Sequence, residues 1–204
     1  MSFKKLINYL NAQYDLSKFV FNNIKIYPEK KKVFNCFDCD FKTLKVVFIG
    51  KKPFDEFSEG LAFDSTDSKS QLHPISELFR YTIENEFHNG LNLSHDHTLN
   101  YLVKQGVLLL NEQLTSCDRI DHAKLWEDFF VEIIKVIQIH HTGIVFCMQE
   151  DSKYLDLINT KLHYILTYKN PNDYVTNFNQ WGFKFKDIND ILIKANGEDY
   201  KINF

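Results

Sequence analysis

The sequence predicts a three-layer α/β/α protein in which a mostly parallel, four-stranded sheet lies between helices. Four short apolar runs, rich in β-branched residues, alternate with longer segments whose apolar residues recur at helical spacing. Strands that alternate with helices in this way are typical of parallel sheets covered on both faces. The length of 204 residues suits one core, so we expect a single domain over 1–204.

The individual elements follow from these patterns. Strands are predicted at 45–49, 107–110, 144–148 and 164–168. Helices are predicted at 3–13, 74–87, 98–105, 122–140, 152–160 and 187–195. Proline in the first turn marks the start of the helix at 74–87. The clearest amphipathic helix, at 122–140, carries an apolar stripe of Leu125, Phe129, Ile133 and Ile137, which Trp126, Phe130 and Ile134 widen.

Composition excludes several classes of protein. The net charge of −3 gives no overall attraction to nucleic acid, so a DNA-binding face would need local clustering of lysines. The longest apolar runs are too short to span a bilayer, and the N-terminus lacks the apolar core of a signal peptide. We therefore expect an intracellular protein, in the cytoplasm or nucleoid, without a membrane partner.

Four cysteines raise the question of a metal site. Cys36 and Cys39 have C-x-x-C spacing, but a structural zinc site needs two further clustered ligands. Cys117 and Cys147 stand alone, and no pair of histidines has the required spacing. We expect buried free thiols, no metal and no cofactor.

Polar and basic residues follow three of the predicted strands. Residues 51–55 come after the first strand, Asn111 after the second and residues 169–172 after the last. Because parallel strands place their carboxyl ends at one edge of the sheet, these segments should converge there. Open α/β sheets bind their ligands at this edge.

Motifs along the chain resemble those of family 1 of the uracil-DNA glycosylase superfamily. Residues 45–54 (KVVFIGKKPF) resemble the family stretch VKVVILGQDPY, residues 60–63 match GLAF, and residues 105–114 (QGVLLLNEQL) resemble QGVLLLNTVL. Weaker matches follow the same order, namely residues 26–28 and 33–37 with YPP…VFNAF, 122–129 with HASLGWETF, 169–172 with HPSP and 201–204 with PIDW. The resemblance covers nearly the whole chain from about residue 24. It implies the glycosylase fold and a site that flips uracil out of DNA and cleaves its glycosidic bond.

The resemblance also implies roles for residues whose type is retained. Phe63 would be the aromatic ring under the flipped base, and Asn111 the amide that reads the uracil edge. A ring can stack on a base, and an amide can donate and accept hydrogen bonds at once. Taken alone, Phe63 is equally explained by core packing, and Asn111 by a turn after the strand.

Two catalytic positions depart from the family pattern. Lys52 occupies the position of the catalytic aspartate, and Asn170 that of the motif histidine. Glycosidic cleavage passes through a cationic sugar, which an anion stabilises and a cation opposes. A charge pair at ~4 Å is worth about 4 kcal/mol at an effective dielectric constant near 20. The catalytic motifs are therefore degenerate.

Other positions at the site change less. Lys51 and Pro53 flank Lys52, and Phe54 replaces the family tyrosine against which thymine clashes. Asp55 replaces a histidine, and we expect it to pair with Lys51 or Lys52. Lys169 and Pro171 belong to the expected DNA-binding segment, and Tyr174 falls where the family inserts an apolar wedge into the space left by the base.

Three functions are consistent with this sequence. The first is a glycosylase-fold protein that has lost ordinary uracil excision and binds uracil-containing, abasic or single-stranded DNA as a pseudoenzyme or repair accessory. Lysines 51, 52 and 169 would then cluster at the mouth of the site. The second is an active glycosylase or an abasic-site lyase in which Lys52 forms a Schiff base. The third is a protein-interaction scaffold without DNA binding.

Overall fold

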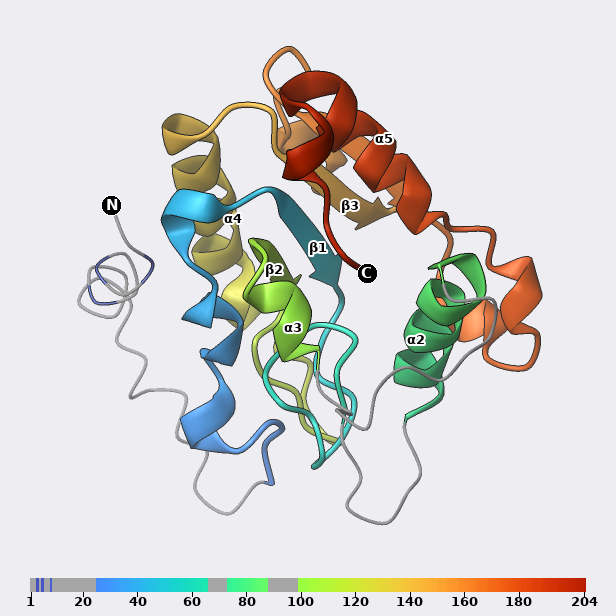
Figure 1. The fold of residues 1–204 in the computed structure, drawn as a ribbon. Coiled ribbons are helices and arrows are strands. Elements are labelled where there is room, and N and C mark those ends of the chain that lie inside the picture. Colours follow the sequence, from blue (N-terminus) through green and yellow to red (C-terminus); the bar gives the residue numbers. More distant parts are fainter. Residues whose placement is uncertain (1–2, 4, 6–7, 9–24, 66–72, 88–98) are drawn as a thin grey trace.

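A computed structural model describes residues 3, 5, 8, 25–65, 73–87 and 99–204 (Figure 1). Its centre is a sheet of four strands: β1 (Val46–Gly50), β2 (Val107–Asn111), β3 (Val145–Gln149) and β4 (Tyr164–Tyr168). All strand pairs are parallel, and the spatial order is β2-β1-β3-β4. The predicted fold class is therefore confirmed, and each expected strand agrees with the observed one to within a residue at either end.

Helices cover both faces of the sheet (Figure 1). They are α2 (Pro74–Phe87), α3 (Asn100–Val103), α4 (Ala123–His140) and α5 (Phe185–Asn196). Single 3-10 turns complete the described elements: η2 (Lys30–Lys32), η3 (Asn35–Asp38), η4 (Phe41–Thr43), η5 (Leu155–Leu157), η6 (Pro171–Tyr174), η7 (Phe178–Gln180) and η8 (Glu198–Tyr200). Most of the helix expected at 3–13 lies outside the described residues.

The prediction of a helix at 152–160 is wrong, because only the 3-10 turn η5 forms there. Its backbone makes only short-range bonds between residues three apart, and two of its backbone groups bond to a side chain of the preceding helix. The Gln138 amide donates to the Leu157 carbonyl at 2.9 Å and accepts from the Asn159 backbone nitrogen at 2.7 Å. These two hydrogen bonds hold the segment against α4 in an irregular conformation.

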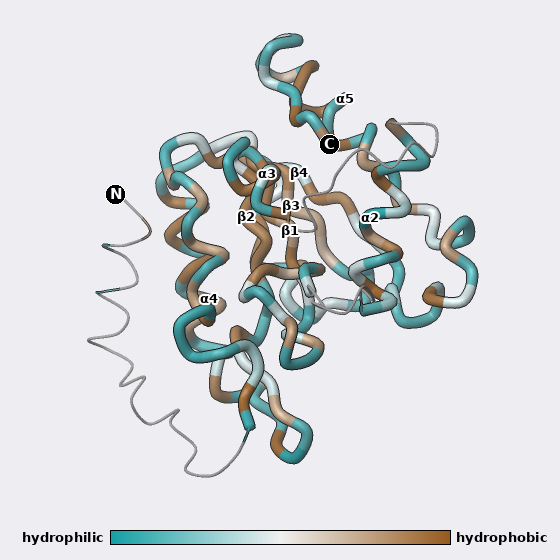
Figure 2. The backbone as a smooth tube through the Cα atoms, turned by 60° about the horizontal axis from the view of Figure 1, so that its bottom comes forward, coloured by the Kyte–Doolittle hydropathy of each residue, from teal (hydrophilic) through white to brown (hydrophobic). Residues whose placement is uncertain are grey.

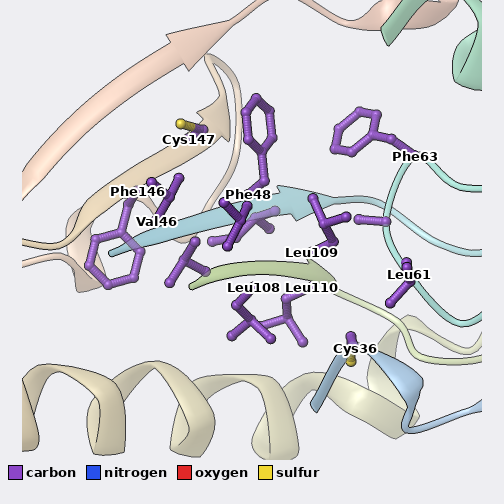
Figure 3. Packing of buried hydrophobic residues seen from close by; sticks show 14 of the residues in the cluster. Cys36, Val46, Phe48, Leu61, Phe63, Leu108, Leu109, Leu110, Phe146 and Cys147 are labelled. Atoms are coloured by element: carbon purple, nitrogen blue, oxygen red, sulfur yellow. The ribbon is translucent and has the colours of Figure 1, made fainter. Parts of the chain in front are cut away.

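Hydrophobic residues concentrate in the central strands, and hydrophobic and hydrophilic residues alternate along the helices (Figure 2). Leu108 and Leu110 lie on the side of the sheet that faces α4, while Phe48 lies on the opposite side (Figure 3). There Phe48 contacts Phe79 of α2 and Phe185 of α5, with ring centroids 5.1 and 5.7 Å apart. Two layers of helices therefore bury the two faces of one sheet.

The apolar stripe of α4 differs from the expected one in one residue. Phe129, Ile133 and Ile137 are buried, but Leu125 is 37% exposed. The buried face is centred instead on Trp126, whose indole nitrogen donates to the Thr115 hydroxyl at 2.7 Å. This hydrogen bond turns the start of α4 so that the tryptophan, and not the leucine, points inward.

All four cysteines are buried free thiols, as expected. Burial raises the pKa of Cys39 to about 12 and raises the pKa values of Cys36 and Cys147 as well. These thiols therefore act as small apolar core residues. Within the described part of the chain, no helix combines the length and the apolar character needed to cross a membrane.

Candidate nucleic-acid site

A cavity of about 360 Å³ opens at the carboxyl edge of the sheet. Its wall combines the segment after β1 (residues 50–54), Gln149 and Tyr168 at the ends of β3 and β4, residues 170–172 of the next turn, and the start of α2. The expected convergence of post-strand segments is thus observed for β1 and β4. The volume is within the range of small-ligand sites.

Gly50 ends β1 at the back of the cavity and must lack a side chain. A Cβ atom there would lie 2.5 Å from Asn111 Oδ1, 2.9 Å from Ala62 Cβ and 3.5 Å from the Phe63 ring. Asn111 pairs in register with Gly50 across the sheet and is only 4% exposed. It therefore lies directly behind Gly50, next to Phe63 but off the cavity wall.

Phe63 forms the inner part of the cavity wall. Its backbone has φ +64°, a conformation that non-glycine residues adopt at a cost of about 1–3 kcal/mol. The ring stacks on Phe79 with centroids 4.7 Å apart and meets the edge of Tyr168 at 5.8 Å. Figure 3 shows Phe63 beyond the end of β1. The backbone nitrogen of Ala62 bonds to the Leu109 carbonyl at 3.0 Å, which fixes this turn to β2.

A buried ion pair secures the residue that follows Phe63. Asp64 accepts from Arg80 Nη2 at 2.7 Å and from the Leu99 backbone nitrogen at 3.2 Å. The Asp64 side chain is fully buried. Burial raises its pKa to about 6, although the Arg80 charge opposes this rise. The pair joins the Phe63 turn to α2 and to the start of α3.

Tyr168 contributes a ring to the cavity and no free hydroxyl. Its OH donates to the Ile49 carbonyl, so the group is occupied by the backbone of β1. Burial raises the pKa of Tyr168 well above its usual value. The side chain is therefore a neutral, fixed aromatic surface.

The two lysines after β1 have different surroundings. Lys51 Nζ pairs with Glu112 Oε2 at 2.8 Å, and Glu112 Oε1 accepts from the Ser152 hydroxyl at 3.0 Å. Lys52 is exposed on the cavity wall and forms no ion pair with any described residue. Lys52 is therefore the uncompensated cation of this loop.

Asp55 does not pair with Lys51 or Lys52, so that expectation is wrong. Its Oδ1 atom accepts from the Phe57 backbone nitrogen at 2.9 Å and from the Ser65 hydroxyl at 3.0 Å. The carboxylate is used to close its own turn, as aspartate commonly does when backbone donors are two residues away.

Residues 170–172 form the outer wall. Asn170 Oδ1 accepts from the backbone and side-chain nitrogens of Asn172, both at 3.2 Å, and this opens the turn η6, in which Pro171 is buried. Lys169 is exposed outside the wall, and its carbonyl accepts from the Trp181 indole at 2.8 Å. Tyr174 is half-buried and packs against the core.

His73 is a wall residue that sequence reasoning missed. Its ring stacks on Phe54 with centroids 4.2 Å apart and planes 6° from parallel. Nδ1 accepts from the Ile75 backbone nitrogen at 3.3 Å, and burial lowers the pKa of the ring. The available signal was a histidine immediately before the proline that starts α2. Gln149 was also missed, because a polar residue at the end of a strand is common and does not by itself indicate a site.

The described part of the cavity wall contains no aspartate or glutamate. It contains Lys51, Lys52, His73 and amide side chains around aromatic rings. Such a site can stack a planar ring and donate hydrogen bonds to an acceptor-rich group. Among the described residues, its wall supplies no anion that could stabilise a developing positive charge.

Proteins with similar sequences are uracil-DNA glycosylases. The protein of that name from Mycoplasmopsis pulmonis is 33% identical over 197 residues, which cover 90% of this chain and 85% of that protein. The Amoebophilus asiaticus protein is 30% identical over 202 residues, covering 94% of this chain and 87% of its own length. No protein-family model matches the chain.

Solved structures agree in fold. The crystal structure of mimivirus uracil-DNA glycosylase superimposes with a TM-score of 0.76 at 18% identity, covering 94% of this chain and 82% of that one. A variant of the mimivirus protein in complex with UGI gives a TM-score of 0.71 at 17% identity, covering 95% and 83%. Because it is 33% identical to one uracil-DNA glycosylase over 90% of this chain, the protein belongs to the uracil-DNA glycosylase family.

Proposed function

We propose that this protein is a DNA-binding member of the uracil-DNA glycosylase family in which ordinary uracil excision is lost or severely weakened. The observation that carries the proposal is the cavity wall, where the described residues supply two lysines and no carboxylate. Lys52 stands where the family motif has its catalytic aspartate.

The charge reversal opposes the chemical step. A carboxylate at ~4 Å from the cationic sugar would contribute about 4 kcal/mol at an effective dielectric constant near 20. An ammonium group removes this stabilisation and adds repulsion. Three to four kcal/mol corresponds to a rate loss of about 10²–10³ before the repulsion is counted.

Binding is expected to survive this change. Phe63 and Tyr168 keep an aromatic surface on which an unpaired base can stack, and such stacking is worth about 1–3 kcal/mol per base. Lys52 and Lys169 are exposed cations at and beside the rim. By their place in the motif order we assign DNA contact to Lys169, Pro171 and Tyr174. The same order assigns base recognition to Asn111, although this side chain lies behind Gly50 and off the described cavity wall.

The names of the relatives support a second candidate, which is retained excision by a different arrangement of groups. The lyase hypothesis would require the Lys52 amine to act as the nucleophile, and this side chain is exposed on the cavity wall. A protein partner is a third candidate, since one solved relative is held in a complex with UGI. A binding measurement between UGI and this chain would test whether the carboxyl edge of its sheet can bind a protein.

One excision assay separates the first two candidates. Single- and double-stranded DNA carrying one uracil is incubated with the wild type, with Lys52→Asp, and with Lys52→Asp/Asn170→His. Lys124→Asp, which reverses the charge of an exposed lysine on α4, is the matched control. We expect no excision by the wild type or the control, and measurable excision by the double variant.

The binding arm uses the same four proteins and fluorescence anisotropy at low salt. We expect the wild type to bind uracil-containing, abasic or single-stranded DNA with an affinity that falls as salt rises. Robust excision by the wild type would overturn the loss of activity. Failure to bind any of these DNAs would overturn the binding role.

A further inference from the structure

Two kinds of side chain on the cavity wall could contact a ligand. Aromatic rings form one part, and the side chains of Lys52, His73 and Asn170 form the other. Each of these three offers a hydrogen-bond donor to the cavity, for a reason that can be read from its contacts.

His73 is held as a donor through its outer nitrogen. Because Nδ1 accepts from the Ile75 backbone nitrogen, the ring proton resides on Nε2. Nε2 makes no hydrogen bond with the described residues. The parallel stack on Phe54 at 4.2 Å fixes the plane of the ring.

Asn170 is held as a donor by its turn. Its Oδ1 atom already accepts two hydrogen bonds from Asn172. The amide nitrogen is therefore the group left for a ligand. Lys52 adds an ammonium group, which can only donate.

Carboxylates close to the cavity are already occupied. Glu112 accepts from Lys51 and Ser152, and Asp55 from its own turn. Asp151 accepts from the Gln149 amide at 2.6 Å. None of these hydrogen bonds involves Lys52, which forms no ion pair with a described residue, so its charge is left for a ligand.

We propose that this cavity binds the terminal phosphate monoester of an unpaired nucleotide, with the nucleotide ring on the aromatic surface and the phosphate on Lys52, His73 and Asn170. A phosphate monoester carries about −1.5 to −2 charges at pH 7 and three strong acceptor oxygens. It therefore matches a wall of donors better than a neutral base or a singly charged diester does. The volume of about 360 Å³ suits one small ligand and not a longer segment.

This inference rests on the proposed role in DNA binding and specifies the kind of DNA. The protein would prefer strand ends that carry a phosphate over ends that carry a hydroxyl. Free mononucleotides present the same chemistry, so the experiment needs separate arms for strand ends and for nucleotides.

The test compares short single strands that differ only in one terminal group: 5′-phosphate, 3′-phosphate or hydroxyl. Anisotropy of a label at the opposite end gives each dissociation constant. We expect at least about tenfold tighter binding to one phosphorylated end, because one charge-assisted hydrogen bond accounts for about that factor. Lys52→Gln should abolish the preference and His73→Phe, which keeps the stack on Phe54, should reduce it. Lys124→Gln, at an exposed site on α4, should leave it unchanged.

Equal affinity for phosphorylated and hydroxyl ends would overturn the inference, as would a preference that survives Lys52→Gln. Calorimetry with dUMP and deoxyuridine gives an independent arm. If no strand binds but dUMP binds at least tenfold tighter than deoxyuridine, the proposed DNA role fails and the phosphate site stands for a free nucleotide. If DNA binds without any end preference and dUMP binds no better than deoxyuridine, only the phosphate site fails.

Discussion

Replacing Asp64 by asparagine removes a negative charge that is buried directly after Phe63. The ordinary pKa of this carboxyl is 3.8, and burial raises it to about 6 in the folded protein. The folded state therefore binds the Asp64 proton more tightly than the unfolded state does. The stability that this proton contributes is fully present below about pH 3.8 and is lost as the pH rises through 6.

The size of the effect follows from the shift. A rise of about two pKa units corresponds to about 3 kcal/mol at 1.36 kcal/mol per unit. Asparagine does not titrate, and its oxygen can still accept from Arg80. The free energy of unfolding of Asp64→Asn minus that of the wild type should therefore increase by about 3 kcal/mol between pH 4 and pH 7.

Urea unfolding followed by circular dichroism at several pH values between 4 and 7.5 measures this difference. Asp190→Asn, at an exposed position on α5, is the matched control for the change from aspartate to asparagine. A difference for Asp64→Asn that stays constant with pH, or that shrinks as the pH rises, would refute the raised pKa.

Three further outcomes are expected. Gly50→Ala should destabilise the fold by about 1–3 kcal/mol in urea, because the new Cβ would lie 2.5 Å from Asn111 Oδ1; an unchanged unfolding midpoint would contradict this close contact. Burial lowers the pKa of His163, so the unfolded state binds its proton more tightly and the contribution of this residue to stability should fall as the pH falls below 6.5. His163→Phe should flatten the profile between pH 5 and 7, and an unaltered slope would count against this histidine as the cause. Thr115→Val should cost about 1–3 kcal/mol, since it leaves the buried Trp126 indole nitrogen without its acceptor at 2.7 Å; a loss below half a kilocalorie would show that another acceptor takes over.

The strands could be predicted from sequence because their signal is local. Each strand of the sheet is a run of five residues rich in Val, Ile, Leu or Phe, and the burial of β1 and β2 on both faces explains why these runs are continuous and not alternating. The convergence of post-strand segments at one edge follows from the parallel arrangement alone. The resemblance to the glycosylase family indicates which residues at this edge belong to the site.

Details that depend on contacts between distant residues could not be predicted. Gln138 bonds to Leu157 and Asn159 about twenty positions later, and this stops a helix that local propensity favours. His73 joins the cavity through Phe54, nineteen positions earlier in the chain. Asp55 was expected to pair with a neighbouring lysine, and it bonds instead to Phe57 and Ser65. Long-range partners of polar side chains leave no periodic trace in a sequence.

The position of β1 in the sheet affects how the protein can be synthesised. β1 lies between β2 and β3, whose first residues, Val107 and Val145, come 61 and 99 positions after Val46. The first of the described strands to be synthesised therefore has no neighbour in the sheet until residue 111 has been added, and it lacks its second neighbour until β3 follows. During that interval an apolar β-branched segment is exposed to other chains, so yield should depend on chaperones and on the rate of translation. The cavity, whose back wall is the end of β1, can form only after the last strand has been added.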